Sequence, residues 1–224
     1  MSIRALFLLL SALALAAGPA HAVFIGNSQG GTDFPQGAVS FADEVVSYDP
    51  VTVGGEPTEP NRGALHSLGL PDYTSGGACA SLDACEFVSL GDGGSITLHF
   101  TDNVLTGSDS TALDLWIFEV GPDVEDTFVE VSSDGTNWSL VGKVFGSTAG
   151  VDLDAFGFGT SAAFAFVRLT DDGAEGDQSG PSVGADIDAV GAISTRPVPE
   201  PSTFALGALG VASIAMRRHI RSRR

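Results

Sequence analysis

The chain has 224 residues, of which 28 are acidic and 10 are Lys or Arg, so its formal net charge is −18 at pH 7. Six of the basic residues lie at the two ends, and residues 23–197 carry 27 acidic and four basic residues, a net charge of about −23. Binding to nucleic acid depends on Lys and Arg that neutralise phosphates. The composition therefore excludes a nucleic-acid partner and favours an exported, soluble protein that meets divalent cations.

The first 22 residues, MSIRALFLLLSALALAAGPAHA, have the pattern of a secretory signal peptide. A basic residue precedes an apolar stretch at residues 5–17, and the small residues Ala20 and Ala22 form a cleavage site. We expect export through the Sec translocon and cleavage by signal peptidase after Ala22. The alternative is an uncleaved anchor, which the shortness of the apolar stretch disfavours.

Residues 23–194 have the length of one domain with a substantial core. The segment 23–76 has a less regular pattern than the rest of the domain. We expect one strand at 38–50 and a long ordered loop with a helical turn at 64–68. Beyond it, short runs of alternating apolar and polar residues predict strands, and Asp134-Gly135 predicts a hairpin turn. These runs lie at 95–100, 112–120, 128–144, 163–170 and 186–194. Short strands separated by polar turns predict an antiparallel sandwich or barrel.

The two cysteines, Cys79 and Cys85, lie six positions apart. An even number of cysteines in an exported chain favours a disulfide, here closing a small loop. A metal site built on the pair would need two further ligands nearby.

Acidic residues recur at the ends of the predicted strands. In the run GADIDAVGA, strict alternation would place Asp186 and Asp188 on the same face of a strand. Calcium binds six to eight oxygen ligands, so we predict a structural calcium site drawn from these two residues and further acids at strand ends. Those further acids are Glu119, Asp171 and Asp172. In the alternative, Asp188 only accepts hydrogen bonds from loop N–H groups, and Arg168, in an apolar strand, pairs with a carboxylate.

The C-terminal residues 199–224 begin with Pro199, Glu200 and Pro201, after an extended linker at 195–198. An apolar run at 204–216 would be about 20 Å long as a helix, against a hydrocarbon core of about 30 Å. Five arginines follow and favour a cytoplasmic C-terminus. This order of features resembles the PEP-CTERM sorting signal of exported Gram-negative proteins.

The PEP-CTERM resemblance implies recognition and cleavage by an exosortase, a membrane protease, near the Pro-Glu-Pro motif. It also implies a cell that makes extracellular polysaccharide. We therefore expect transient anchoring in the inner membrane, followed by a position at the cell surface or outside the cell. The alternative is a permanent tail-anchored helix.

The middle of the chain resembles the galactose-binding-like jelly rolls, the architecture of discoidin and of many carbohydrate-binding modules. The closest parts are the run SSDGTNW and the strand FVRL that follows it. The resemblance implies an all-β, antiparallel jelly-roll β-sandwich, flanked here by an N-terminal signal helix and a short C-terminal hydrophobic helix.

The sequence carries no His-Glu-x-x-His motif and no phosphate-binding loop, so we expect no catalysis. We predict an exported surface or matrix protein associated with exopolysaccharide. The alternative is a calcium-dependent carbohydrate-binding module, with Tyr73 and Trp116 as ligand-binding residues; a glycan-active enzyme is a weaker third hypothesis. Apart from structural calcium, no cofactor is expected.

Overall fold

The computed structural model describes residues 21–26, 30–50, 55–74, 79–120, 125–145, 149–176 and 179–198. The predicted signal helix and the predicted C-terminal helix lie outside these residues, as do Ala20 and the motif Pro199-Glu200-Pro201. Within the described residues, no helix has the length and hydropathy needed to cross a bilayer.

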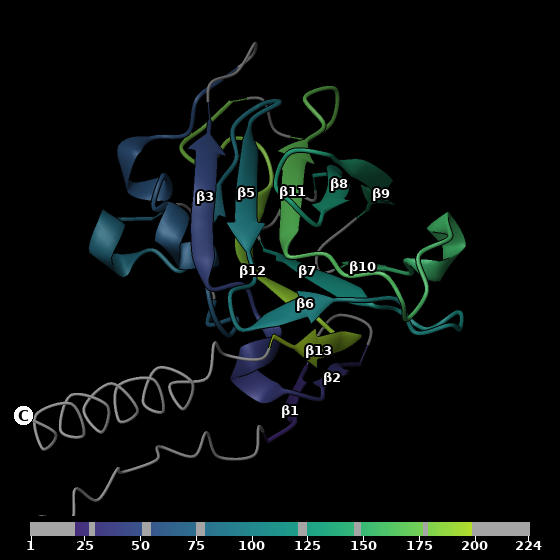
Figure 1. The fold of residues 1–224 in the computed structure, drawn as a ribbon. Coiled ribbons are helices and arrows are strands. Elements are labelled where there is room, and N and C mark those ends of the chain that lie inside the picture. The colour runs from purple at the N-terminus through teal and green to yellow at the C-terminus, as the bar shows by residue number, and fades with distance from the viewer. Residues whose placement is uncertain are drawn as a thin grey trace, which may run out of the picture.

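Two antiparallel sheets form the body of the domain, and Figure 1 shows the larger one in front of the smaller. The five-stranded sheet has the order β3–β5–β11–β8–β9, and the four-stranded sheet has the order β10–β7–β12–β4. The larger sheet contains β3 (Glu44–Asp49), β5 (Ser95–His99), β8 (Thr127–Ser132), β9 (Ser139–Val144) and β11 (Phe166–Asp171). The smaller contains β4 (Val88–Ser89), β7 (Leu115–Glu119), β10 (Ala149–Val151) and β12 (Asp186–Ala192).

Successive strands mostly alternate between the two sheets, because β4, β7, β10 and β12 belong to one sheet and β5, β8, β11 to the other. This alternation is the connectivity of a jelly roll, and it confirms the predicted all-β sandwich. The hairpin predicted around Asp134-Gly135 joins β8 to β9, and Gly135 has a positive φ of 70° in its turn. The described residues of the long 55–87 segment contain only short 3-10 turns, η2 (Glu59–Asn61), η3 (Ala64–Ser67) and η4 (Leu82–Ala84).

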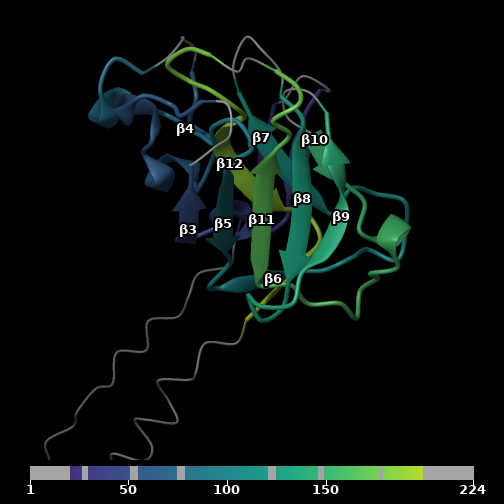
Figure 2. The ribbon, with the colours of Figure 1, turned by 90° about the horizontal axis from the view of Figure 1, so that it is seen from above.

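The main core lies between the two sheets. Alternate residues of β5, β8 and β11 point into it, and the intervening residues face outward, as the period of two predicts. The inward residues include Ile96, Leu98, Val129, Val131, Val167 and Leu169. Figure 2, seen from above, shows β11 and β8 on one side and β12 and β7 on the other.

A second apolar cluster covers the outer face of the four-stranded sheet. Phe34 and Phe41 pack there with ring centroids 4.6 Å apart, over Trp116 and Phe118 of β7. The covering segment contains β1 (Val23–Ile25), β2 (Thr32–Phe34) and η1 (Gly37–Ser40). Consequently every residue of β7 and of β12 is buried, and the four-stranded sheet is an inner layer of the domain.

A strand pairing near the C-terminal end of the domain and a disulfide in the long 55–87 segment hold further parts of the chain in place. The residues predicted to be a linker are extended, and three of them form β13 (Thr195–Pro197), which pairs with β6 (Asn103–Leu105). Val198 N–H donates to the Asp102 carbonyl oxygen at 2.9 Å. Cys79 and Cys85 are joined by a disulfide across η4, with their Cα atoms 5.0 Å apart.

Candidate functional site

Three of the five acids predicted as calcium ligands meet at one end of the sandwich. Glu119 ends β7, Asp171 ends β11 and Asp186 begins β12; Glu119 lies opposite Ile187, beside Asp186. All three are buried. The charges of Asp186 and Asp171 raise the pKa of Glu119, and the charge of Asp171 also raises the pKa of Asp186. The structure thus brings these acids together from three strands.

Asp188 does not share the environment of Asp186, and the predicted strict alternation of β12 is wrong. A β-bulge interrupts the pairing with β7 between Ile187 and Ala189. As a result Ile187 and Val190 both enter the main core, whereas Ala189 enters the second apolar cluster. An extra residue in one strand shifts every later side chain to the other face, and no alternation pattern reveals it.

The Asp188 carboxylate accepts hydrogen bonds from the backbone N–H groups of Asp72 and Tyr73, at 3.1 and 3.4 Å. This contact is the alternative considered for Asp188, an acid that caps loop N–H groups. Asp171 acts in the same way, because its two oxygens accept from Gly93 N–H at 2.9 Å and Ala185 N–H at 2.8 Å. Both residues therefore fix loops to the ends of strands.

Burial changes the ionisation of these acids. It raises the pKa of Glu119 to about 9, with further increases from the charges of Glu125 and Asp186. It raises the pKa of Asp186 to about 8, although the hydrogen bond from the Ser89 hydroxyl acts in the opposite direction. Burial also raises the pKa of Asp188 to about 7. At neutral pH, Glu119 and Asp186 are therefore held mainly as neutral carboxylic acids.

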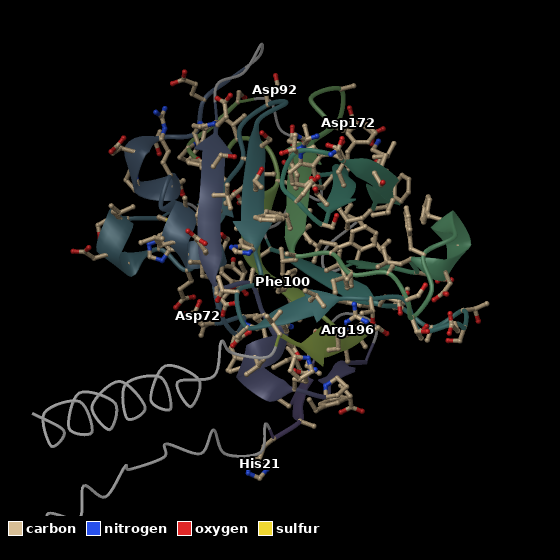
Figure 3. All side chains as sticks on the ribbon, in the orientation of Figure 1. His21, Asp72, Asp92, Phe100, Asp172 and Arg196 are labelled. Carbon is tan, nitrogen blue, oxygen red and sulfur yellow. A yellow bond between two sulfur atoms is a disulfide. The ribbon has the colours of Figure 1, made fainter. Side chains whose placement is uncertain are left out.

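A lysine ammonium group lies within the acidic cluster that contains the fifth predicted ligand, Asp172. Lys143 Nζ lies 2.7 Å from Asp126 Oδ2, 2.5 Å from Asp172 Oδ2 and 3.6 Å from Glu175 Oε1. The hydrogen bonds to Asp126 and Asp172 hold the pKa of Lys143 well above its usual value. Asp172 lies at the end of the domain that also carries Asp92, far from Arg196 (Figure 3).

A different acidic cluster was missed by the sequence reasoning. Asp114, Asp152 and Asp154 each offer a carboxylate oxygen, and these atoms lie within 4.8 Å of one another. The only sequence signal was the Asp-x-Asp spacing at residues 152–154, which is common in so acidic a chain. Among the described residues, two clusters therefore have the composition to hold a metal ion. In the cluster that contains Asp172, the Lys143 ammonium group already contacts the acids.

The two predicted ligand-binding aromatics differ in accessibility. Trp116 is only 2% exposed and belongs to the cluster beneath Phe34 and Phe41, so it cannot offer its ring to a ligand. The prediction for Trp116 is wrong because both faces of β7 are buried. Tyr73 is half-buried and packs edge-on against Phe87, with centroids 5.9 Å apart.

A row of aromatic and charged side chains lies on the outer face of the five-stranded sheet. The Arg168 guanidinium carbon lies 4.4 Å from the centroid of the Trp138 ring, and Arg168 pairs with Glu130 at 2.6 Å. Two residues before Arg168 on the same strand, the Phe166 ring stacks on the His99 ring of β5 with centroids 4.3 Å apart. His99 and Phe166 are directly paired residues of β5 and β11, and Arg168 is paired with Glu130 of β8.

These five residues, Glu130, Trp138, Phe166, Arg168 and His99, are called the sheet platform below. The side chains of Arg168, Glu130 and His99 are 32%, 24% and 26% exposed, so the platform meets solvent while its members hold one another in place. In Figure 1 no helix or strand passes in front of β5, β11 and β8. Figure 3 shows their outward side chains from the same side.

One of two serine-containing motifs lies in the described part of the chain, and it lacks the geometry of a nucleophile elbow. The spacing Gly-x-Ser-x-Gly occurs at 26–30 and at 180–184, and the sequence reasoning overlooked both. Residues 27–29 lie outside the described residues. The second stretch lies in the loop before β12 and leads into a strand, whereas a nucleophile elbow joins a strand to a helix.

The two-sheet topology defines a β-sandwich domain, and the tail carries a sorting signal. Residues 197–221 match the family described as the PEP-CTERM protein-sorting motif. This motif marks an exosortase-sorted, exported protein. It covers only the tail, and no curated protein matches the chain with significant sequence similarity.

Solved structures with similarity to the chain include two domains from bacteria. One is described as CpGH89CBM32-6 produced by Clostridium perfringens, at 13% identity, covering 48% of this chain and 74% of that one with a TM-score of 0.31. Another is the C-terminal domain of a chitobiase from Bacteroides fragilis, at 14% identity, covering 72% of this chain and 97% of that one with a TM-score of 0.38. The sandwich assignment itself follows from the sheet order given above.

Proposed function

We propose that the mature region is a non-catalytic domain of the cell surface or extracellular matrix that associates with exopolysaccharide through the sheet platform. The observation that supports this role is the row of paired side chains on the open face of β5, β11 and β8. Neighbouring strands lie about 4.8 Å apart. The platform therefore extends across neighbouring strands, which suits a chain-like ligand better than a small molecule.

The chemistry of the platform suits a polyhydroxylated chain. Aromatic rings offer apolar surface to the C–H faces of sugar rings, and a few fixed polar groups give orientation. Here Trp138 and Phe166 supply the rings, and Arg168 and Glu130 supply a donor and an acceptor for hydroxyl groups. Because Arg168 is already stacked on Trp138 and paired with Glu130, its side chain loses little entropy on binding.

Calcium is the cation we propose to assist this association. Residues 23–197 carry a net charge of about −23, so an anionic polysaccharide would be repelled unless a divalent cation bridges the two surfaces. A neutral polysaccharide would need no such bridge. Binding to an anionic polysaccharide is therefore expected to require millimolar calcium, and binding to a neutral one is not.

The test is a titration of polysaccharide isolated from the producing cells against the exported protein, followed by calorimetry. We expect Phe166→Ala and Trp138→Ala each to weaken saturable binding by about tenfold, which corresponds to about 1.4 kcal/mol. The matched control is Phe24→Ala, which removes a 61% exposed ring from β1, outside the platform.

Each outcome of this titration assigns the function differently. Loss of binding in Tyr73→Ala with retention in Phe166→Ala would move the ligand site to the loop that Asp188 caps. The absence of saturable binding by the unmodified protein would contradict the proposal and favour a purely structural matrix role.

A further inference from the structure

The structure assigns a calcium site to Asp114, Asp152 and Asp154, at the side of the sandwich where β7 begins. The assignment is independent of the sheet platform and of the acids predicted from the sequence. It rests on the strand register, on an oxygen of Asp114 and on a comparison with the cluster around Lys143.

Strand pairing brings the three acids together. β10 pairs with β7 so that Val151 lies opposite Leu115, and Asp114 N–H donates to the Val151 carbonyl oxygen at 2.8 Å. If this register is continued by one residue pair, Asp152 lies opposite Asp114. Asp154 begins η5 (Asp154–Phe156), one turn further on. The positions of Asp114 and Asp152 are therefore fixed by the pairing of two strands.

Asp114 is completely buried, yet one of its oxygens has no hydrogen bond. Oδ2 accepts from Leu153 N–H at 2.9 Å, whereas Oδ1 is buried and accepts no hydrogen bond from the described part of the chain. The Ser108 and Ser194 hydroxyls are close enough to the carboxyl to oppose the rise in its pKa that burial causes. A buried carboxylate oxygen without a partner costs free energy unless a cation or donor satisfies it.

The other two acids are oriented by backbone N–H groups. Asp152 Oδ1 accepts from Asp154 N–H at 2.9 Å, which folds residues 152–154 into a tight turn. The Asp154 oxygens accept from Ser108 N–H at 2.8 Å and Asp109 N–H at 3.1 Å, which ties the β6–β7 loop to η5. Asp152 Oδ1 also accepts from Ala155 N–H at 3.3 Å, and Asp154 Oδ2 also accepts from the Ser108 hydroxyl at 3.2 Å. The capacity to bind a cation therefore lies with the other oxygen of each carboxylate, and these hydrogen bonds fix the ligands without occupying them fully.

The cluster around Lys143 shows how this chain neutralises three acids with its own side chain. There the ammonium group lies within 4.0 Å of three carboxylates, Asp126, Asp172 and Glu175. At Asp114, Asp152 and Asp154, no Lys or Arg of the described residues forms an ion pair. An external cation would supply the charge here that Lys143 supplies there.

The ligand set selects the class of cation. Carboxylates, with the nearby hydroxyls of Ser108 and Ser194, are hard oxygen ligands, and neither His nor Cys belongs to the cluster. Calcium accepts six to eight such oxygens in an irregular arrangement, whereas magnesium requires a nearly regular octahedron. Sites of extracellular modules bind calcium with dissociation constants of about 0.1–1 mM.

The test uses the full exported protein, stripped with a chelator and titrated with calcium chloride by calorimetry and thermal melting. We expect one site and, at about ten times the dissociation constant, a melting temperature about 3–6 °C higher. Asp152→Asn should weaken binding at least tenfold, and so should Asp114→Asn. The matched control is Glu175→Gln in the Lys143 cluster, which should bind as the unmodified protein does.

Three results would overturn the assignment. They are the absence of heat and melting shift in the unmodified protein, calcium binding by Asp152→Asn at full affinity, and loss of binding in Glu175→Gln alone. Asp152 is only partly buried, so its variant keeps the test decisive if Asp114→Asn fails to fold. Magnesium chloride should bind at least tenfold more weakly, and equal affinity would contradict the choice of calcium.

Discussion

Several buried acids of this domain accept hydrogen bonds from the backbone of loops, and Asp188 is one of them. Its carboxylate holds the Asp72–Tyr73 turn against the bulge in β12, at the cost of removing an ionisable group from water. Burial raises its pKa to about 7, and that of Glu119 to about 9. Unfolded carboxyl groups titrate near pH 4. The domain therefore holds acids that prefer to be protonated when it is folded.

Because these acids have raised pKa values in the folded domain, its stability falls as the pH rises. Between about pH 4 and pH 9 the folded chain binds more protons than the unfolded chain, so the free energy of unfolding decreases with pH through this window. Replacing Asp188 by Asn removes one such group, and we expect it to flatten the decrease between pH 4 and pH 8 by roughly 2–4 kcal/mol. Urea unfolding at pH 4.5, 6 and 8 measures this slope.

The control for this prediction is Asp83→Asn, which changes an exposed acid of η4. Its slope should equal that of the unmodified protein. An unchanged slope in Asp188→Asn would show that Asp188 ionises in the folded domain as freely as in water.

Among the elements, β12 is buried on both faces, as β7 is. At Gly191 the second cluster lies close against the backbone of β12. A Cβ atom on Gly191 would lie 2.5 Å from Phe34 Cε1 and 2.9 Å from Phe41 Cε1. Glycine at this position allows two phenylalanine rings to close over the sheet.

Gly191→Ala is therefore expected to destabilise the domain by about 1–3 kcal/mol, because the two rings must shift within a packed cluster. Thermal melting should show a decrease of about 3–10 °C for a domain of this size. Gly26→Ala is the matched control, since a Cβ atom there meets nothing within 4 Å. A melting temperature equal to that of the control would show that the cover formed by Phe34 and Phe41 is loosely packed.

The same elements show what alternation in the sequence can and cannot reveal. The strands β5, β7, β8, β9, β11 and β12 were all predicted near their observed positions, because each carries a run of alternating or apolar residues. The bulge in β12 and the burial of Trp116 were not predictable, since both depend on which segment covers the outer face of the smaller sheet. The Asp114 cluster depends on the pairing of β7 with β10, which no local pattern records.

At the scale of the whole molecule, charge is divided sharply along the chain. The β-sandwich region is strongly acidic, whereas the last eight residues contain five arginines. A sorting motif at 197–221 joins the two parts. An acidic domain on one side of a membrane and an arginine cluster on the other is the arrangement that the positive-inside rule favours.

Glu200 lies at the centre of the sorting motif, so its replacement tests the proposed processing. We expect Glu200→Ala to leave the uncut precursor in the membrane fraction, detected by mass spectrometry of the C-terminus and by fractionation. Ser202→Ala, two residues further on, serves as the comparison and should be processed. Normal cleavage and release of Glu200→Ala would contradict recognition through the Pro-Glu-Pro motif.

The pairing of β13 with β6 has a mechanical consequence for the precursor. Among the described residues the last backbone hydrogen bond is made by Val198, one residue before Pro199, and the Gln36 side chain ties the β2–η1 segment to Thr195 of the same edge. Figure 1 shows β1, β2 and β13 together at this edge, and Figure 3 shows Asp92 and Asp172 at the opposite end. β13 therefore holds the chain against the domain up to the residue before Pro199. A protease that cuts at the Pro-Glu-Pro motif would act directly beside this hydrogen-bonded edge, so the folded domain itself limits how far the enzyme can reach along the chain.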